Sequence, residues 1–127
     1  MLHFGDRAYL YGTVAMSILK FLDTTELEEF ATGLAGDLAR RFPPASEART
    51  DPGATHQIKV ILEGLAARAV RYHDQHKLGI YKKAKLANVF KWKLSELGYS
   101  ADFVDRATKE LATRLASSKA QSKTAQP

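Results

Sequence analysis

The sequence predicts an all-α fold, a single compact bundle of about five helices followed by a disordered polar tail. Apolar residues recur at the three- and four-residue spacing of amphipathic helices along most of the chain, and no stretch shows the alternation typical of a strand. Glycines, prolines and capping residues divide this pattern into five segments. The length of 127 residues and the apolar fraction of 45% suit one globular domain, which we assign to residues 1–116.

The first predicted helix covers residues 6–22, with Asp6 as its N-cap. Its polar stripe consists only of Thr13, Ser17 and Lys20. A helix that is apolar over most of its circumference is normally buried on several sides. We therefore expect this helix at the centre of the bundle or in a subunit interface, so that a homodimer is one prediction.

The second helix starts with a capping box formed by Thr25 and Glu28. Its apolar stripe consists of Leu27, Phe30, Ala31, Leu34, Leu38 and Phe42. Pro43 and Pro44 end this helix. The polar residues near 43–53 are then predicted to form a mobile linker.

The third helix begins at Asp51 and Pro52, or alternatively at Thr55. Its predicted core stripe consists of Ile58, Ile61, Leu62, Leu65, Ala69, Tyr72 and His76. The helix is expected to end near His76, with Gly79 as its C-cap residue.

The fourth helix, over residues 79–98, is the most basic part of the chain and carries five lysines. The face predicted to point to the core holds Ile80, Leu86, Ala87, Phe90, Leu94 and Leu97. The opposite face mixes aromatic and basic residues. Lysines neutralise phosphates and exposed aromatic rings stack on unpaired bases. This face therefore predicts a DNA- or RNA-binding site that consists of Tyr81, Lys82, Lys85, Trp92 and Lys93.

The fifth helix follows a stop at Gly98 and is capped by Ser100. Its stripe consists of Phe103, Val104, Ala107, Leu111 and Leu115, and residues 117–127 are predicted to be disordered because they hold no large apolar residue. The fourth and fifth helices could form a helix-turn-helix. Asp102 and Asp105 would then face phosphates, so we interpret the pair as a structural hairpin.

Composition narrows the possible functions. The chain has no cysteine, which excludes disulfides, thiolate nucleophiles and cysteine-bound metal centres. The net charge of +5 favours acidic partners such as nucleic acid. The apolar run over residues 8–22 is too short to span a membrane and contains Lys20. It also lacks the pattern of a signal peptide, so we expect a cytoplasmic protein without a membrane partner.

The histidines of the third helix offer two further interpretations. His73 and His76 could chelate a metal, but no third ligand is evident, and we predict neither a metal nor a cofactor. The run from Arg71 to His76 resembles the pattern of HEPN helical ribonucleases, in which an arginine precedes a histidine by a few residues. That resemblance implies that Arg71 and His76 are paired RNA-cleaving residues and that the protein dimerises.

Three functions remain as hypotheses. The leading one is a small nucleic-acid-associated protein that uses the basic aromatic face. The alternative is a protein-interaction module (an adaptor, regulator or assembly subunit) that uses the apolar first helix and an exposed Trp92. The third is the HEPN-like ribonuclease. Because no other catalytic arrangement is evident, the sequence does not decide whether the protein is an enzyme, and it favours a protein without catalytic activity.

Overall fold

The computed structural model describes residues 24–125, with side chains as far as residue 118. Within this range the chain forms α2 (Thr25–Arg41), the short 3-10 helix η1 (Pro44–Ala48), α3 (Pro52–His76), α4 (Ile80–Leu97) and α5 (Ala101–Ala125). No strand occurs in the described range, which confirms the all-α prediction for it. The helix predicted over residues 6–22 lies outside the described residues.

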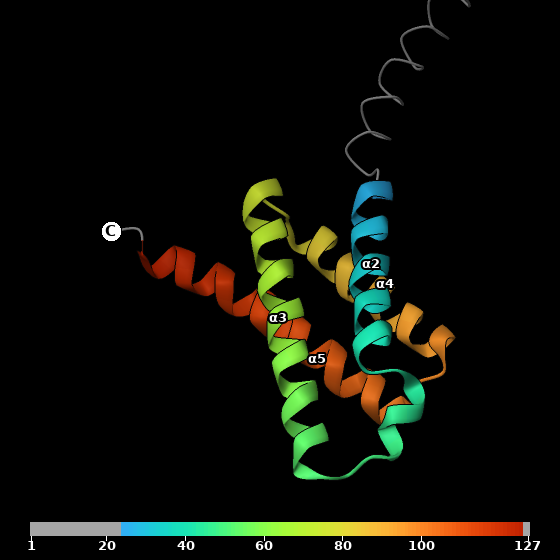
Figure 1. Cartoon of the computed structure of the whole chain (residues 1–127). Coiled ribbons are helices and arrows are strands. Elements are labelled where there is room, and N and C mark those ends of the chain that lie inside the picture. The colour runs from blue at the N-terminus through green and yellow to red at the C-terminus, as the bar shows by residue number, and fades with distance from the viewer. Residues whose placement is uncertain (1–23, 126–127) are drawn as a thin grey trace, which may run out of the picture.

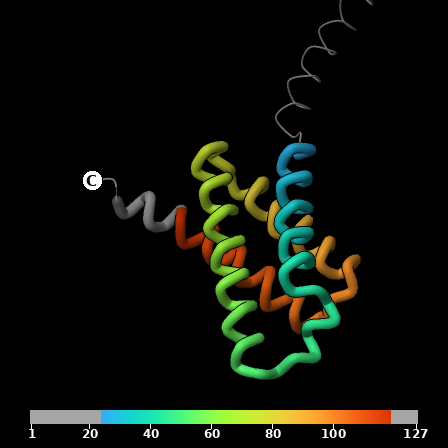
Figure 2. The backbone as a smooth tube through the Cα atoms, viewed as in Figure 1, coloured from blue at the N-terminus to red at the C-terminus, as the bar shows by residue number. Residues whose placement is uncertain are grey.

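The helices form two layers. α2 and α3 run antiparallel beside each other, and α4 and α5 cross behind them (Figure 1, Figure 2). α2 packs mainly on α4, α3 packs mainly on α5, and α4 also packs on α5, whereas α2 and α3 meet over a smaller area. The core therefore lies between the layers.

Each helix contributes apolar residues at helical spacing to one continuous core. The largest fully buried side chains are Leu34 and Leu38 of α2, Leu65 of α3, Leu86, Phe90 and Leu94 of α4, and Leu111 and Leu115 of α5. All eight belong to the apolar stripes that the sequence predicts. No charged side chain of the described residues is buried, so this core is held together by apolar packing.

Two residues assigned to the core of α4 are exposed instead. Ile80 is 73% exposed and Leu97 is 44% exposed. They are the first and last residues of α4. Neighbouring helices cross α4 near its middle and cover the side chains there, whereas side chains at the helix ends lie beyond the crossing points. Apolar periodicity alone therefore does not determine whether these end residues are buried.

The start of α2 differs from the predicted capping box. Thr25 is the first helical residue, and the N-cap is Thr24, whose side chain makes no capping hydrogen bond. The Glu28 carboxylate lies 3.5 Å from Lys85 Nζ on α4. The Glu28 carboxylate thus pairs with Lys85 of another helix, whereas in a capping box it would accept a hydrogen bond from the backbone at the start of α2.

The start of α3 confirms the prediction at Asp51 and Pro52. Asp51 accepts a hydrogen bond from the backbone N–H of Ala54 at 3.0 Å. Arg49 donates to both Asp51 carboxylate oxygens at 3.3 Å. The Arg49 guanidinium, followed by the Ala54 N–H, holds the pKa of the Asp51 carboxyl below its usual value.

The end of α3 corrects the assignment of Gly79 as a C-cap. Lys77 takes the left-handed conformation with φ of 50°, whereas Gly79 has φ of −78° and is the N-cap of α4. Leu78 is only 6% exposed, and its backbone N–H donates to the His73 carbonyl at 3.4 Å. The burial of Leu78 offsets the cost of a left-handed lysine, because an apolar residue next to the cap commonly completes such a turn.

Gly98 ends α4 as predicted. It has φ of 103°, in the left-handed region that favours glycine. The Gly98 N–H donates to the Ser95 carbonyl at 3.1 Å, and the Tyr99 N–H donates to the Leu94 carbonyl at 3.3 Å. These two bonds define a Schellman motif.

The segment predicted to be a mobile linker contains η1, which is bonded to the start of α5. Ser100 is confirmed as a cap, since its Oγ accepts from the Phe103 N–H at 3.2 Å. Glu47 of η1 accepts from the Ser100 N–H at 2.8 Å and from Ser100 Oγ at 2.6 Å. Glu47 thereby takes the role of the glutamate in a capping box, from a position 53 residues earlier. The mobility of the segment stays a prediction.

We expect Glu47→Ala to lower the free energy of unfolding by about 1 kcal/mol, because the N-terminus of α5 loses two acceptors. Urea denaturation measures this loss. Glu63→Ala is the matched control: it removes an exposed glutamate that bonds to no described residue, and it should change stability by less than about 0.5 kcal/mol. Equal losses in the two variants would contradict this assignment of Glu47.

Tyr99 ties the end of α2 to the turn before α5. Its hydroxyl donates to the Phe42 carbonyl, and its ring stacks on Phe103 with centroids 4.7 Å apart. Burial, followed by the nearby Glu47 carboxylate, raises the pKa of Tyr99 to about 12. The neutral hydroxyl is therefore the form that the fold favours.

At neutral pH we expect Tyr99→Phe to be less stable than the wild type by about 1–2 kcal/mol, because the Phe42 carbonyl loses its donor. An unfolded tyrosine loses its proton near pH 10. Between that pH and about 12 the native state keeps the proton longer, so this contribution falls as pH rises. The gap between wild type and variant should narrow over this window in urea denaturation. A constant gap would contradict the shift.

The C-terminal boundary also differs from the prediction. α5 continues to Ala125, whereas disorder was predicted from residue 117. The last buried side chain among the described ones is Leu115. The lack of large apolar residues after this point ends the core, but it does not end the helix. Alanine, lysine and glutamine in this stretch have good helix propensity.

Candidate functional site

The two aromatic residues of the predicted site lie on the outer surface of α4. Tyr81 is 60% exposed and Trp92 is 65% exposed. The three lysines of the site, Lys82, Lys85 and Lys93, are half-buried. Tyr81, Lys85 and Trp92 follow one another along a single stripe of the helix. α4 therefore places all five predicted residues on one side of the molecule.

Trp92 also borders a groove between α4 and α2. We call this groove, of about 540 Å³, the Trp92 groove; its lining residues are Thr25, Glu28, Glu29 and Thr32 of α2 and Val89, Trp92 and Lys93 of α4. The α2 residues recur at the spacing of one helix face. Threonine methyl groups, the Val89 side chain and the indole ring make much of its surface apolar. Sequence reasoning missed this second wall, because these α2 residues have the polarity of a solvated face.

Two of the three lysines of this surface are matched by carboxylates of the same chain. Lys85 Nζ lies 3.5 Å from Glu28, and Lys93 Nζ lies 3.2 Å from Glu96. Glu29 adds a further negative charge in the groove. Exposed ion pairs of this kind contribute little to stability. They do, however, break up the continuous positive surface that a polyanion needs.

Other carboxylates flank α4 on the side of α5. Lys91 Nζ lies 3.9 Å from Asp105 near the start of α5. This pair connects the two helices of the predicted hairpin. The exposed Asp102 lies in the first turn of α5. Carboxylates at this position disfavour a phosphate backbone, in agreement with the structural interpretation of the hairpin.

His76 is exposed at the end of α3, which corrects its assignment to the core. Its side chain is 34% exposed, and its Nε2 lies 3.8 Å from Glu26 Oε1. The Tyr72 ring lies 4.1 Å from the His76 ring and 4.2 Å from the Phe30 ring. The three rings connect α3 to α2 at the surface. His76 is the last residue of α3, so it lies beside the first turn of α2 and outside the core.

Arg71 and His76 do not form a pair within one chain. Both are exposed, and five residues along a helix correspond to a rotation of about 140°. The two side chains therefore point away from each other. Among the described residues, no group of three or more histidine, aspartate or glutamate side chains could hold a metal ion.

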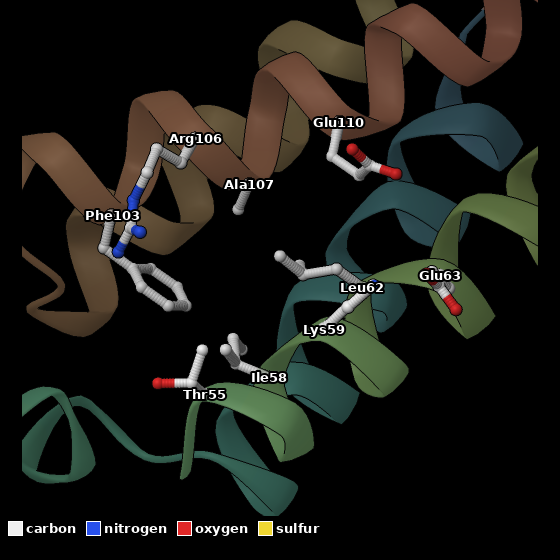
Figure 3. Close-up of a pocket in the computed structure, with 9 residues that line it drawn as sticks. All are labelled: Thr55, Ile58, Lys59, Leu62, Glu63, Phe103, Arg106, Ala107 and Glu110. Carbon is white, nitrogen blue, oxygen red and sulfur yellow. The ribbon is translucent and has the colours of Figure 1, made fainter. Parts of the chain in front are cut away.

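A second cleft lies between α3 and α5 (Figure 3). Its volume is about 320 Å³, and its apolar lining consists of Ile58, Leu62, Phe103 and Ala107. Its rim carries Lys59 and Glu63 of α3, and Arg106 and Glu110 of α5. In each helix the basic residue precedes the acidic one by a single turn. This repeated spacing is a signal that sequence reasoning missed. The cleft is at the lower end of ligand-pocket sizes, and its balanced rim favours neither anions nor cations.

Comparison of the chain with protein-family models, with curated proteins and with solved structures gives no significant match. No helix in the described part of the chain combines the length and the apolar character that crossing a bilayer requires. The functional argument therefore rests on the surfaces described above.

Proposed function

We propose that this protein is a non-catalytic protein-interaction module that docks a partner protein in the Trp92 groove. The observation that carries this proposal is the 65% exposure of Trp92 beside an apolar groove. Tryptophan is among the residues that contribute most to protein interfaces, particularly when it fills a desolvated pocket. A partner that covers the groove would remove the indole ring and Val89 from water together.

Binding of DNA or RNA through Tyr81, Lys82, Lys85, Trp92 and Lys93 is the competing proposal. The aromatic exposure and the positive net charge support it. Glu28 and Glu96 beside the lysines, together with Glu29, weaken it, because a phosphate would have to displace or approach these carboxylates. A ribonuclease has less support still, since Arg71 and His76 point away from each other in one chain.

Two variants separate the proposals. Trp92→Ala removes the apolar contact, and Lys82→Glu/Lys85→Glu reverses the charge. Immobilised wild type and Trp92→Ala are first used to capture partners from cell extract. The protein that only the wild type retains is then purified and titrated by calorimetry. Single- and double-stranded oligonucleotides are titrated in parallel between about 50 and 200 mM salt.

For a protein partner, we expect Trp92→Ala to weaken binding by about 30-fold or more, whereas charge reversal and added salt change it by less than about threefold. The oligonucleotides should bind weakly at the higher salt concentration. The proposal is wrong if oligonucleotides bind tightly with a steep salt dependence that charge reversal abolishes, while no purified protein binds in a Trp92-dependent way.

A further inference from the structure

The cleft between α3 and α5 carries opposite charges at its two ends. Arg106 lies at one end, and Glu63 and Glu110 lie at the other (Figure 3). The two helices run in the same direction along the cleft, so the helical turn between Arg106 and Glu110 separates the charges along its length. We infer that this cleft binds a short apolar peptide with free termini, which carries a carboxylate at one end and an ammonium group at the other.

None of the four charged side chains on the rim of the cleft has an ion-pair partner among the described residues. On each helix the basic residue and the acidic residue are one turn apart, but neither pair comes within ion-pair distance. Lys59 lies on α3 between the two ends (Figure 3). Its ammonium group can donate a hydrogen bond to a backbone carbonyl of a bound peptide. The charges of the rim are thus free to contact a ligand.

A smaller hollow of about 110 Å³ extends the cleft at the end where Arg106 lies. The hollow and the cleft share Thr55, Ile58, Phe103 and Arg106. The other two charged residues of the hollow, Glu47 and Arg49, already bond within the chain. Arg106 is therefore the charged group at this end that a ligand can reach without displacing a described partner. Its guanidinium has the planar geometry that binds a carboxylate through two hydrogen bonds.

The arrangement of these charges favours a zwitterion over other apolar ligands. A fatty acid would have no partner for Glu63 and Glu110, and its chain would approach their carboxylates. A polyamine would gain from these carboxylates but would be repelled by Arg106 and Lys59. A zwitterion with an apolar body places one charge at each end and its body on the apolar lining, which is the usual composition of a ligand site.

The length of the cleft is that of a peptide of about three residues. From Thr55 to Glu63 the cleft follows α3 for about 12 Å. Three residues of an extended chain span about 10 Å. A free amino acid carries both charges on one carbon atom and cannot reach both ends. We therefore expect the carboxylate of a tripeptide at Arg106, its ammonium group between Glu63 and Glu110, and its middle side chain on the apolar lining.

The peptide site is separate from the Trp92 groove. The groove lies between α2 and α4, and it shares no lining residue with the cleft. Binding of a small peptide is therefore additional to the proposed docking of a protein partner and does not depend on it. Variants in the cleft leave the groove intact, so the two proposals can fail independently.

Titration of the ¹⁵N-labelled full chain with alanyl-leucyl-alanine, followed by NMR, tests the peptide site. We expect saturable binding with a Kd of about 1 mM or lower. The largest shift changes should occur at the backbone amides of Ile58, Leu62, Phe103 and Ala107. Acetylation of the peptide's N-terminus and amidation of its C-terminus each remove one charge. Each should weaken binding by about fivefold.

Variants of the chain assign each terminus to its partner. Arg106→Gln should weaken binding of the free peptide by about fivefold, and amidation should then have no further effect. Glu63→Gln combined with Glu110→Gln should do the same for acetylation. Arg114→Gln is the matched control, because Arg114 is an exposed arginine on α5 outside the cleft. It should change the Kd by less than about twofold.

The inference is overturned if the free, acetylated and amidated peptides bind equally, because the charges at the ends then have no role. It is equally overturned if only one of the two modifications weakens binding, since the cleft then recognises a single charge and not a zwitterion. Absence of saturable binding up to about 10 mM, or shift changes centred on the Trp92 groove, would also refute the site. None of these results would affect the docking of a protein through Trp92.

Discussion

Replacing Trp92 by alanine is expected to weaken partner binding strongly while leaving the fold unchanged. The indole ring is 65% exposed, so its removal should alter the free energy of unfolding by no more than about 0.5 kcal/mol. The same substitution should weaken the interaction by about 2 kcal/mol or more, because the ring is the largest apolar group of the groove. Urea denaturation measures the first effect, and sedimentation or calorimetry measures the second.

Tyr81→Ala is the matched control for this substitution. Tyr81 is 60% exposed on the same helix but does not line the Trp92 groove. Its loss should therefore change protein binding by less than about threefold. If both substitutions weakened binding equally, and charge reversal at Lys82 and Lys85 did the same, the whole basic aromatic face would be the site. That result would favour the nucleic-acid proposal.

Replacing Phe90 by alanine is expected to have the opposite pattern, with a large loss of stability. Phe90 is 1% exposed in the core beneath α4. Truncation of a buried phenylalanine costs about 3–5 kcal/mol, from lost transfer free energy and from the cavity left behind. That is a large share of the stability of a domain of this size. The midpoint of urea denaturation measures the loss.

Phe90→Leu provides the control, because it keeps an apolar side chain in the site and should cost clearly less than the alanine substitution. A cost of Phe90→Ala below about 1 kcal/mol would contradict the packing of α4. Phe90 and Trp92 lie two residues apart, so their contrasting results together test the orientation of this helix.

Much of the fold could be predicted because the signals that specify it are local. The buried stripe with Phe90 at its centre follows from the spacing of apolar residues. Asp51, Gly98 and Ser100 were recognised as helix boundaries because each acts on backbone groups within a few residues. Gly79 was assigned wrongly because the left-handed conformation at Lys77 depends on the burial of Leu78, a tertiary contact.

The site was predictable only in part, for the same reason. The spacing along α4 indicated that Tyr81 and Trp92 share an outer face. It did not indicate that Glu28, far away in sequence, pairs with Lys85, or that α2 supplies the second wall of the groove. These contacts change the interpretation of the lysines. In the sequence, this face of α4 resembles a phosphate-binding surface. In the folded protein, α2 lies beside it and places carboxylates among its lysines, so that positive and negative charges alternate.

The most direct measurement of the central claim is the fluorescence of Trp92 as the purified partner protein is added. Trp92 is the single tryptophan of the chain, so the signal reports only this groove. If the partner covers the groove, emission shifts to shorter wavelength and iodide quenching decreases as the partner is added, and neither change depends strongly on salt. If Trp92 stays accessible at every concentration of the partner and is quenched only on addition of oligonucleotides at low salt, the groove is not a protein-docking surface.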